Sequence, residues 1–168
     1  MSQDILLLTA LVAVILMGSA MCSGIEAALL AVNPLRVHEL ARRKPKVLGA
    51  IRLEKLRHRI GRTLTVVTIA NNSFNIFGSL MVGSYATYIF QDRIGNVKPI
   101  FFVGLTILVL LLGEIVPKAL GTRLALQISL TSAPVLDFLS IVMRPLLIVL
   151  ERLLPIITAK SELTTDEE

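Results

Sequence analysis

Hydroxyl, amide and carboxylate oxygens interrupt three stretches of this sequence that are otherwise strongly apolar. In the first stretch, GSAMCSGIE places Ser19, Ser23 and Glu26 at i, i+4 and i+7, which is one face of a helix. In the second, ANNSFN places Asn71 and Asn75 four residues apart, again on one helical face. Asparagine is a poor helix former, and its amide is costly to leave unpaired in hydrocarbon. These positions therefore require a specific role.

Other small or polar residues of the second stretch lie either on the same helical face as Asn71 and Asn75 or on a different face. Thr68, Gly78 and Ser79 are predicted to share the face of the two amides. Asn72 lies about 100° round the helix from Asn71. We therefore expect Asn72 to serve partly in packing, and we keep it as an additional ligand candidate.

The third interruption, LLLGEIVPKALG, combines a carboxylate with a helix-breaking residue. Pro117 has no N–H and cannot bond the carbonyl four residues earlier, which belongs to Gly113. That carbonyl stands beside Glu114 and is free to face a ligand.

Counting at a helical rise of about 1.5 Å per residue places these groups at similar depths in a hydrocarbon core about 30 Å thick. Ser19 lies roughly 21 Å and Glu114 roughly 22 Å from one face of the core, and Asn71 lies about 12 Å from the other face. Polar groups at such depths usually face a bundle interior and mark a substrate path. The predicted ligand set is Ser19, Ser23, Asn71, Asn75, the Gly113 carbonyl and Glu114, with Asn72, Glu26 and Pro117 as additional candidates.

A ligand set made only of oxygens suits hard cations such as Mg²⁺, Ca²⁺ or Na⁺, and it argues against Zn²⁺ or Cu⁺. His38 and His58 fall in a charged loop, and core packing explains Met17, Met21 and Cys22. The sequence shows no nucleophile–histidine–acid set, metal-hydrolase motif or phosphate-cradling glycine loop, so an enzyme is not expected.

Each polar residue also has a purely structural explanation. Serine and asparagine side chains often hydrogen-bond neighbouring membrane helices and hold a bundle together. For Ser19 or Ser23 taken singly, this structural role is about as good an explanation as ion binding. For Asn71 and Asn75 it is the weaker explanation, because adhesion between helices rarely needs two amides one turn apart. Glu26 lies near the end of its span and serves either as a cap or salt-bridge partner or as part of the site.

The elements that carry these residues are predicted to be membrane spans. The chain has 168 residues, 54% of them hydrophobic, and a mean hydropathy of +0.76. Charge is absent from three runs, Ile5–Ile25, Thr63–Gln91 and Ile100–Gly113. These runs reach the length of about 20 residues that crosses a bilayer, the third when it is extended from Lys98 through Pro117. We predict an all-α integral membrane protein with spans at about residues 5–32, 63–90 and 98–118.

A strongly basic loop, residues 33–62, joins the first two spans. It holds ten of the seventeen Lys and Arg residues, which explains the net charge of +5 without a nucleic acid partner. Basic loops stay in the cytoplasm, so the N-terminus is predicted outside, and the loop and C-terminus inside. Two short amphipathic helices, Leu40–Lys46 and Leu48–Arg59, are predicted in the loop, with anionic lipid headgroups or phosphates as expected contacts.

The stretch 124–143 is apolar but carries Pro134, Asp137 and several hydroxyls. A crossing would put Arg144 and Arg152 outside, against the charge rule. We therefore predict a bent helix along or around the bundle, with juxtamembrane helices over residues 124–157. A fourth span is the alternative. The polar tail, residues 161–168, is predicted to be disordered.

The three motifs quoted above, with the first extended to SGIEAALLAVNPLRVHEL, together resemble the transmembrane domain of the CorC and cyclin M (CNNM) family of magnesium transporters. They are similar to that family's S-G-x-E-x-A pattern before a basic stretch, its G-N-x-x-x-N pattern and its G-E-x-x-P-K pattern. The order and spacing agree across almost the whole chain. Ile25, Ala70 and Ser73 depart from the residues usual in the family, and none of these departures removes a candidate oxygen.

The resemblance implies Mg²⁺ efflux coupled to Na⁺ entry by a homodimer in the plasma membrane, which in a bacterium is the inner membrane. It implies that the predicted ligand set lines the Mg²⁺ site. It also implies a pair of cytosolic CBS domains that bind ATP, which we expect to follow Glu168 in a longer protein. One carboxylate does not neutralise Mg²⁺, so we expect moderate affinity. Na⁺ at the same carboxylate would give the coupling.

The residues also allow two other functions. The protein could be a magnesium-sensing regulatory subunit of another transporter, without transport of its own. It could also be a structural membrane anchor for a soluble domain.

Overall fold

The computed structural model describes residues 2–43, 49–89 and 97–150, and every regular element in these ranges is helical, as the sequence predicts. The elements are α1 (Ser2–Ala31), α2 (Pro34–Arg43), α3 (Ala50–Arg57), α4 (Ile60–Ile89), α5 (Val97–Leu108), η1 (Val109–Ile115), α6 (Val116–Arg123) and α7 (Ala125–Val142).

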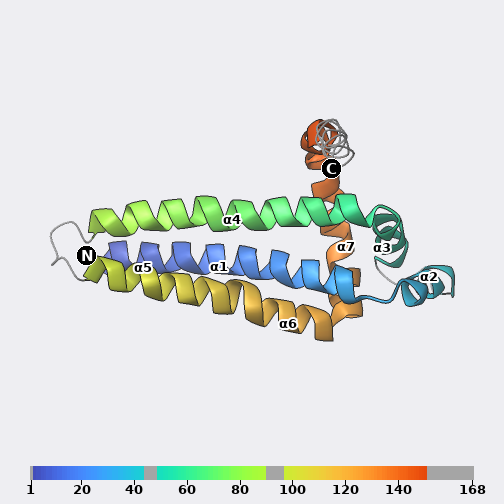
Figure 1. Ribbon diagram of the computed structural model, residues 1–168, viewed down its shortest axis with the longest axis horizontal. Helices are drawn as coiled ribbons and strands as arrows, with labels where there is room; N and C mark the ends of the chain where they lie inside the picture. The colour runs from blue at the N-terminus through green and yellow to red at the C-terminus, as the bar shows by residue number, and fades with distance from the viewer. Residues whose placement is uncertain (1, 44–48, 90–96, 151–168) are drawn as a thin grey trace, which may run out of the picture.

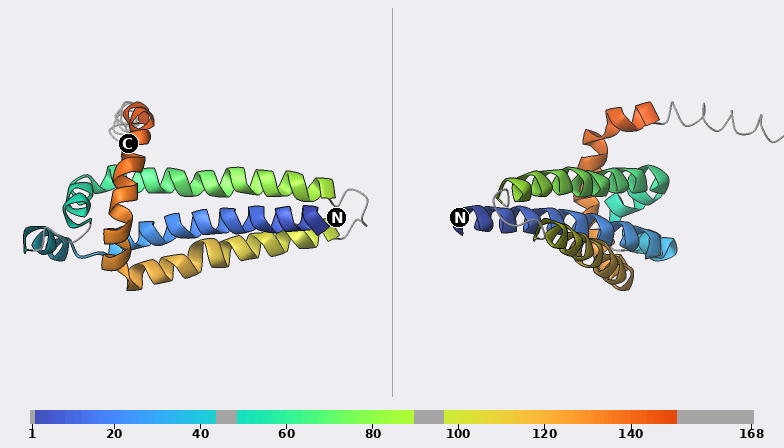
Figure 2. Two further views of the ribbon diagram at one scale, coloured as in Figure 1. Left: turned by 180° about the vertical axis from the view of Figure 1, so that it is seen from behind. Right: turned by 60° about the vertical axis from the view of Figure 1, so that its left-hand side comes forward.

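α1 is the central helix of a three-helix bundle. It lies between α4 and the continuous helix formed by α5, η1 and α6, as Figures 1 and 2 show. Large apolar side chains cover the outside of the bundle, among them Leu6 at 73% exposed, Phe77 at 66% and Ile100 at 72%. Soluble monomers rarely expose apolar surface on this scale. These faces are therefore the lipid-facing surface of an integral membrane protein.

Within the described ranges, three helices are long and apolar enough to cross a membrane, namely Gln3–Ala31, Pro99–Arg123 and Ala125–Val142. α4 matches α1 in length, at 30 residues, but falls outside this set. Its asparagines, which lower its hydropathy, account for this difference. α4 nevertheless runs side by side with α1 along the bundle. α7, in contrast, runs across the end of the bundle (Figure 1). The predicted spans correspond to α1, α4 and α5–η1–α6, and the predicted belt to α7.

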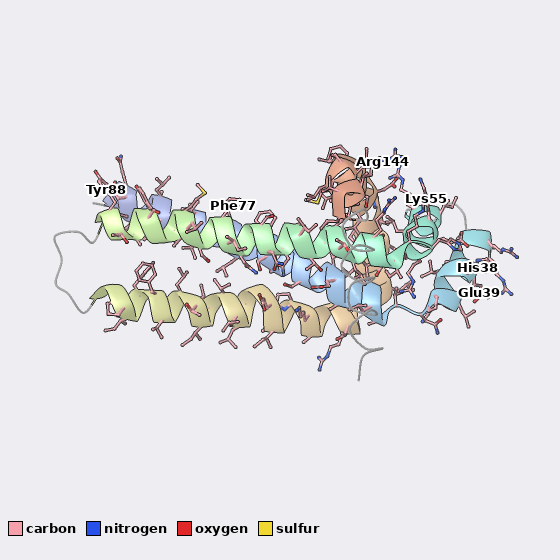
Figure 3. The ribbon with its side chains drawn as sticks, turned by 45° about the horizontal axis from the view of Figure 1, so that its top comes forward. His38, Glu39, Lys55, Phe77, Tyr88 and Arg144 are labelled. Atoms are coloured by element: carbon pink, nitrogen blue, oxygen red, sulfur yellow. The ribbon has the colours of Figure 1, made fainter. Side chains whose placement is uncertain are left out.

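The end of the bundle that carries α2, α3 and α7 is called the hairpin end below. Charged side chains gather there, as Figure 3 shows for His38, Glu39 and Lys55. His38 Nδ1 lies 2.5 Å from Glu54 Oε1 and joins α2 to α3. A hydrophobic core fixes the end of α1 to these helices, and its buried members are Leu29, Val32, Val37, Leu53, Leu56, Val67, Ala133 and Leu136.

The first loop helix differs from its prediction, because α2 begins at Pro34 rather than at Leu40 and ends at Arg43. Asn33 precedes it, and its Oδ1 accepts a hydrogen bond from the Leu35 N–H at 2.9 Å. An asparagine cap satisfies a free N–H at the helix start, and proline suits the first helical position. These two local signals, rather than apolar periodicity, set where the helix begins.

The second loop helix, predicted over Leu48–Arg59, is α3 over Ala50–Arg57. It starts after Gly49, whose φ of +85° is a left-handed conformation that favours glycine. A Cβ at this position would collide with the carbonyl of Leu130 in α7. The close approach docks the start of α3 directly on α7.

α7 turns sharply at both ends. Leu124, with φ −104° and ψ 29°, forms the corner between α6 and α7. Helix resumes over residues 144–150 after a turn at Met143, so the change of direction follows α7, whereas residues 125–142 form one helix that includes Pro134. Residues 90–96 between the second and third predicted spans, the end of the juxtamembrane helix near residue 157 and the tail at 161–168 lie outside the described residues.

Arg57 of α3 caps the last turn of α1, because its Nη1 donates to the Leu29 carbonyl at 2.6 Å. We expect Arg57→Met to lower the free energy of unfolding by about 1.5–3 kcal/mol, because a charge-assisted hydrogen bond is lost while the apolar stem is kept. Denaturant titration in detergent measures this change. The control, Arg52→Met on the exposed side of α3, is expected to stay within about 0.5 kcal/mol of the parent. Equal losses in both variants would contradict the cap.

Candidate functional site

Two serines of α1 meet one asparagine of α4 at the centre of the bundle. Ser19 Oγ donates to Asn71 Oδ1 at 3.1 Å, and Ser23 Oγ lies 3.5 Å from the same oxygen. Both serines are fully buried and Asn71 is 6% exposed. The prediction that these residues lie at one level is confirmed. One amide oxygen thus lies within reach of two hydroxyls that stand one helical turn apart.

The carbonyl of Gly113 enters the same cluster from the third helix, 3.4 Å from Ser19 Oγ. The segment around it, η1, is a π-helix, in which the N–H of Val116 donates to the carbonyl of Leu111, five residues back. Pro117 follows directly, and its missing N–H leaves the Gly113 carbonyl without the usual helical partner. The prediction that this carbonyl is free to face other groups is therefore confirmed.

Asn75 and Glu114 form a second contact, one turn further along α4 toward the N-terminal end of α1. Asn75 Nδ2 donates to Glu114 Oε1 at 3.2 Å and joins α4 to η1. The other amide atom, Asn75 Oδ1, is buried and has no hydrogen-bond partner among the described residues. Buried polar atoms are nearly always paired. An unpaired acceptor beside a carboxylate is a ready ligand for a cation.

Glu26 makes a third contact on the other side of the centre, nearer the hairpin end. Thr68 Oγ1 of α4 donates to Glu26 Oε1 at 3.1 Å. Glu26 therefore adjoins the Asn71 cluster but is not bonded to it. The predicted ligand set omits Thr68, although its spacing from Asn71 and Asn75, at i, i+3 and i+7, is the signal that identifies it.

Three predicted positions have other roles. Asn72 is exposed on α4, so the structure of the single chain does not show the partial packing expected of it, and its part in the ligand set stays a prediction. Ser79 is also exposed, because eight residues at about 100° each rotate it about 80° from Asn71 and off the shared face. Pro117 is half-buried, and its backbone carbonyl lies close to Gly24 of α1. It shapes the helix around the Gly113 carbonyl, and no hydrogen bond places it in the cluster.

The composition of the site limits its chemistry. Among the described residues, no three His, Cys, Asp or Glu side chains come together in a way that could hold a metal ion. A cation bound between α1, α4 and η1 would therefore depend on neutral oxygens and the Glu114 carboxylate. Such a donor set holds hard cations, and it offers no thiolate or imidazole to a soft one.

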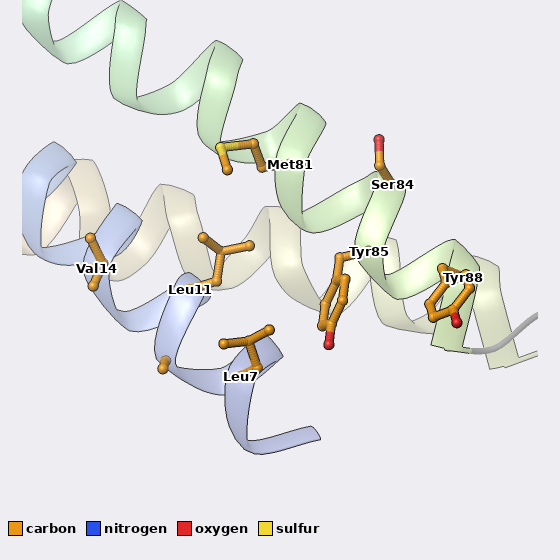
Figure 4. A pocket seen from close by; sticks show the side chains of 8 residues that line it. Leu7, Leu11, Val14, Met81, Ser84, Tyr85 and Tyr88 are labelled. Atoms are coloured by element: carbon orange, nitrogen blue, oxygen red, sulfur yellow. The ribbon is translucent and has the colours of Figure 1, made fainter. Parts of the chain in front are cut away.

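The apolar groove in Figure 4 is a separate feature. It lies between α1 and α4 toward the N-terminal end of α1, and encloses about 640 Å³, with Leu11 and Val14 across from Met81 and Tyr85. Its lining is overwhelmingly carbon. A hard cation needs several oxygen ligands, so this groove is not the ion site.

The fold and the site together define a multi-pass membrane protein with buried oxygens gathered from three helices. Comparison with known proteins gives the same class, because residues 10–168 match the cyclin M transmembrane N-terminal domain. The chain belongs to the cyclin M (CNNM) transmembrane domain family.

Two curated relatives are similar over most of this chain. The UPF0053 protein sll1254 of Synechocystis sp. is 37% identical over 147 residues, which is 87% of this chain and 41% of that protein. The UPF0053 inner membrane protein YfjD of Escherichia coli is 28% identical over 149 residues, which is 88% of this chain and 33% of that protein. The chain thus spans less than half the length of either relative.

Proposed function

We propose that this protein transports Mg²⁺ across the membrane and that the ion passes between α1, α4 and η1. The observation that carries the proposal is the convergence of buried oxygens from three helices. Asn71 Oδ1 and the Gly113 carbonyl both lie within 3.4 Å of Ser19 Oγ. Asn75 Oδ1, unpaired beside Glu114, adds a further acceptor. Packing alone does not account for an unpaired amide oxygen in a membrane bundle.

The spacing of the oxygens is compatible with a hard cation. Ligands at the corners of an octahedron stand about 3.0 Å apart around Mg²⁺ and about 3.4 Å apart around Ca²⁺, given metal–oxygen distances of about 2.1 and 2.4 Å. The two separations from Ser19 Oγ, 3.1 Å to Asn71 Oδ1 and 3.4 Å to the Gly113 carbonyl, are hydrogen-bond distances that fall in the same range, so a cation could replace the serine proton without a large movement of the oxygens. For the ion to bind, the serine protons must turn away from these acceptors. Serine in a helix can donate instead to the carbonyl four residues back.

The charge of the site supports release as well as binding. Glu114 supplies one negative charge against two on Mg²⁺, and Mg²⁺ gives up its water reluctantly, so we propose binding of moderate affinity. Na⁺ binding at Glu114 would compete with Mg²⁺ for the same carboxylate. Na⁺ that binds from the outside would then displace Mg²⁺ to the outside. The result is efflux of Mg²⁺ coupled to entry of Na⁺.

The proposal also covers the orientation of the protein, the membrane in which it lies and its partners. The excess of Lys and Arg in residues 33–62 supports a cytoplasmic hairpin end and an external N-terminus. The Escherichia coli relative is named an inner membrane protein, which supports the plasma membrane of a bacterium. From the family resemblance we propose a homodimer that works with cytosolic CBS domains and ATP in the full-length protein.

Two adjacent asparagines give a matched test of the ion site. We expect Asn71→Ala to weaken Mg²⁺ binding on the order of tenfold or more, because the oxygen shared by Ser19 and Ser23 is lost. Asn72→Ala removes the same group from an exposed position, and its affinity is expected to stay within about twofold of the parent. Isothermal titration calorimetry with MgCl₂, with and without NaCl, measures both. Equal effects of the two substitutions would contradict the placement of the site, and binding without flux would favour a sensor.

A further inference from the structure

A cavity of about 380 Å³, lined by both polar and apolar residues, lies at the hairpin end, apart from the ion site. It forms where two chain turns meet. One turn leads from the end of α1 through Asn33 into α2, and the other leads from α6 through Leu124 into α7. Arg36 enters the lining from the first turn and Arg123 from the second. Two guanidinium groups from distant parts of the sequence thus border one cavity.

Neither arginine is neutralised by the rest of the described chain. Within residues 2–43, 49–89 and 97–150, no ion pair or hydrogen bond involves the side chain of Arg36 or Arg123. The nearest carboxylate along α2, Glu39, instead pairs with Arg43 at 3.0 Å and is 54% exposed. Two unpaired guanidinium groups facing one cavity favour an anion with several oxygens.

The backbone adds hydrogen-bond donors that carry partial positive charge, as the arginines carry full positive charge. α7 begins at Ala125, and residues 125–127 line the cavity. The N–H groups in the first turn of a helix have no partner within the helix and carry partial positive charge. Gln127 contributes an amide that can also donate. The cavity therefore combines two fixed charges with neutral donors, and its lining contains no carboxylate.

We propose that this cavity binds a phosphate group, held between Arg36 and Arg123. A phosphate offers the tetrahedral oxygens that forked guanidinium groups bind well. Two sources carry this group, the headgroup of an anionic phospholipid and a soluble phosphate compound. Leu124, which lines the cavity, is 46% exposed, and Leu120, one turn earlier in α6, is 49% exposed. These exposed apolar side chains could contact the acyl chains of a bound lipid.

The test compares two double substitutions that change net charge equally. Arg36→Gln with Arg123→Gln removes both proposed ligands. Arg52→Gln with Arg59→Gln removes two exposed arginines that do not line the cavity. The purified full chain is examined by native mass spectrometry in a neutral detergent with phosphatidylglycerol or phosphatidylcholine, and by calorimetry with inorganic phosphate.

We expect the first pair to lower binding of phosphatidylglycerol or of inorganic phosphate about tenfold, and the control pair to leave it within about twofold, because only the first removes charge-assisted bonds. Loss confined to the lipid assigns the site to a headgroup, and loss confined to inorganic phosphate assigns it to a soluble phosphate. Equal losses in both double variants, or no loss in the first, would overturn the proposal. Mg²⁺ titration of the same proteins reports on the ion site separately, because neither pair touches it.

Discussion

Glu114→Gln is expected to reduce Mg²⁺ flux in proteoliposomes on the order of tenfold or more. Glutamine keeps the size of the side chain, and it can still accept from Asn75 Nδ2, which now donates to Glu114 Oε1 at 3.2 Å. What is lost is the negative charge beside the unpaired oxygen Asn75 Oδ1. Because neutral oxygens alone balance none of the charge on Mg²⁺, both occupancy and coupling to Na⁺ should fall. Flux is followed with a Mg²⁺-sensitive dye under an imposed Na⁺ gradient.

Glu39→Gln is the matched control for this experiment. Glu39 is an exposed carboxylate of α2 that pairs with Arg43 in the next turn, so its loss changes net charge by the same amount far from the bundle centre. We expect its flux to stay within about twofold of the parent, because exposed ion pairs contribute little. If Glu114→Gln transported Mg²⁺ as the parent does, the proposed mechanism would be wrong.

Gly121→Ala is expected to destabilise the bundle by about 1–3 kcal/mol or more. Gly121 of α6 is buried where α6 crosses α1, and a Cβ there would collide with the carbonyl of Gly24 and lie 3.1 Å from the Cβ of Ala27. The colliding atom belongs to the backbone, so the two helices must move apart. Small residues at such crossings let membrane helices approach closely, which is the source of their dispersion energy. Unfolding by denaturing detergent, or a thermal scan in mild detergent, measures the loss.

Two other glycines provide the control for the same change. A Cβ at Gly61 of α4 or at Gly104 of α5 would meet nothing within 4 Å. Alanine also has the higher helix propensity, so Gly61→Ala and Gly104→Ala should be neutral or stabilising by up to about 1 kcal/mol. A ranking in which all three variants lose equal stability would show that the α1–α6 crossing has no special role.

Much of the fold follows from the sequence because a bilayer imposes strong and simple constraints. Long apolar runs must be helices there, since backbone groups find no other partners in hydrocarbon. Helical rise is fixed, so the sequence places Ser19, Asn71 and Glu114 at similar depths. The face of Asn71 and Asn75 likewise follows from an angle of about 100° per residue.

Other features depend on contacts that a linear pattern does not contain. Pro117 predicts a free Gly113 carbonyl, but the π-helical path that carries it also depends on packing against α1. The pairing of Thr68 with Glu26 needs the relative rotation of α1 and α4. The start of α2 is set by a local cap at Asn33, whereas apolar spacing predicts a start at Leu40.

α1 packs along both of its neighbours, whereas in the described chain no extended packing joins α4 to η1. The direct link between these two is the Asn75–Glu114 hydrogen bond. A packed apolar face resists separation through many contacts, but a hydrogen bond can be exchanged for one to water at small net cost. The contact between α4 and η1 is thus the weakest helix–helix contact around the site, whereas α1 is held on both sides. If the protein transports Mg²⁺ as proposed, a tilt of either neighbour against α1 would hydrate the buried oxygens by a small hinge movement, without a rearrangement of the bundle.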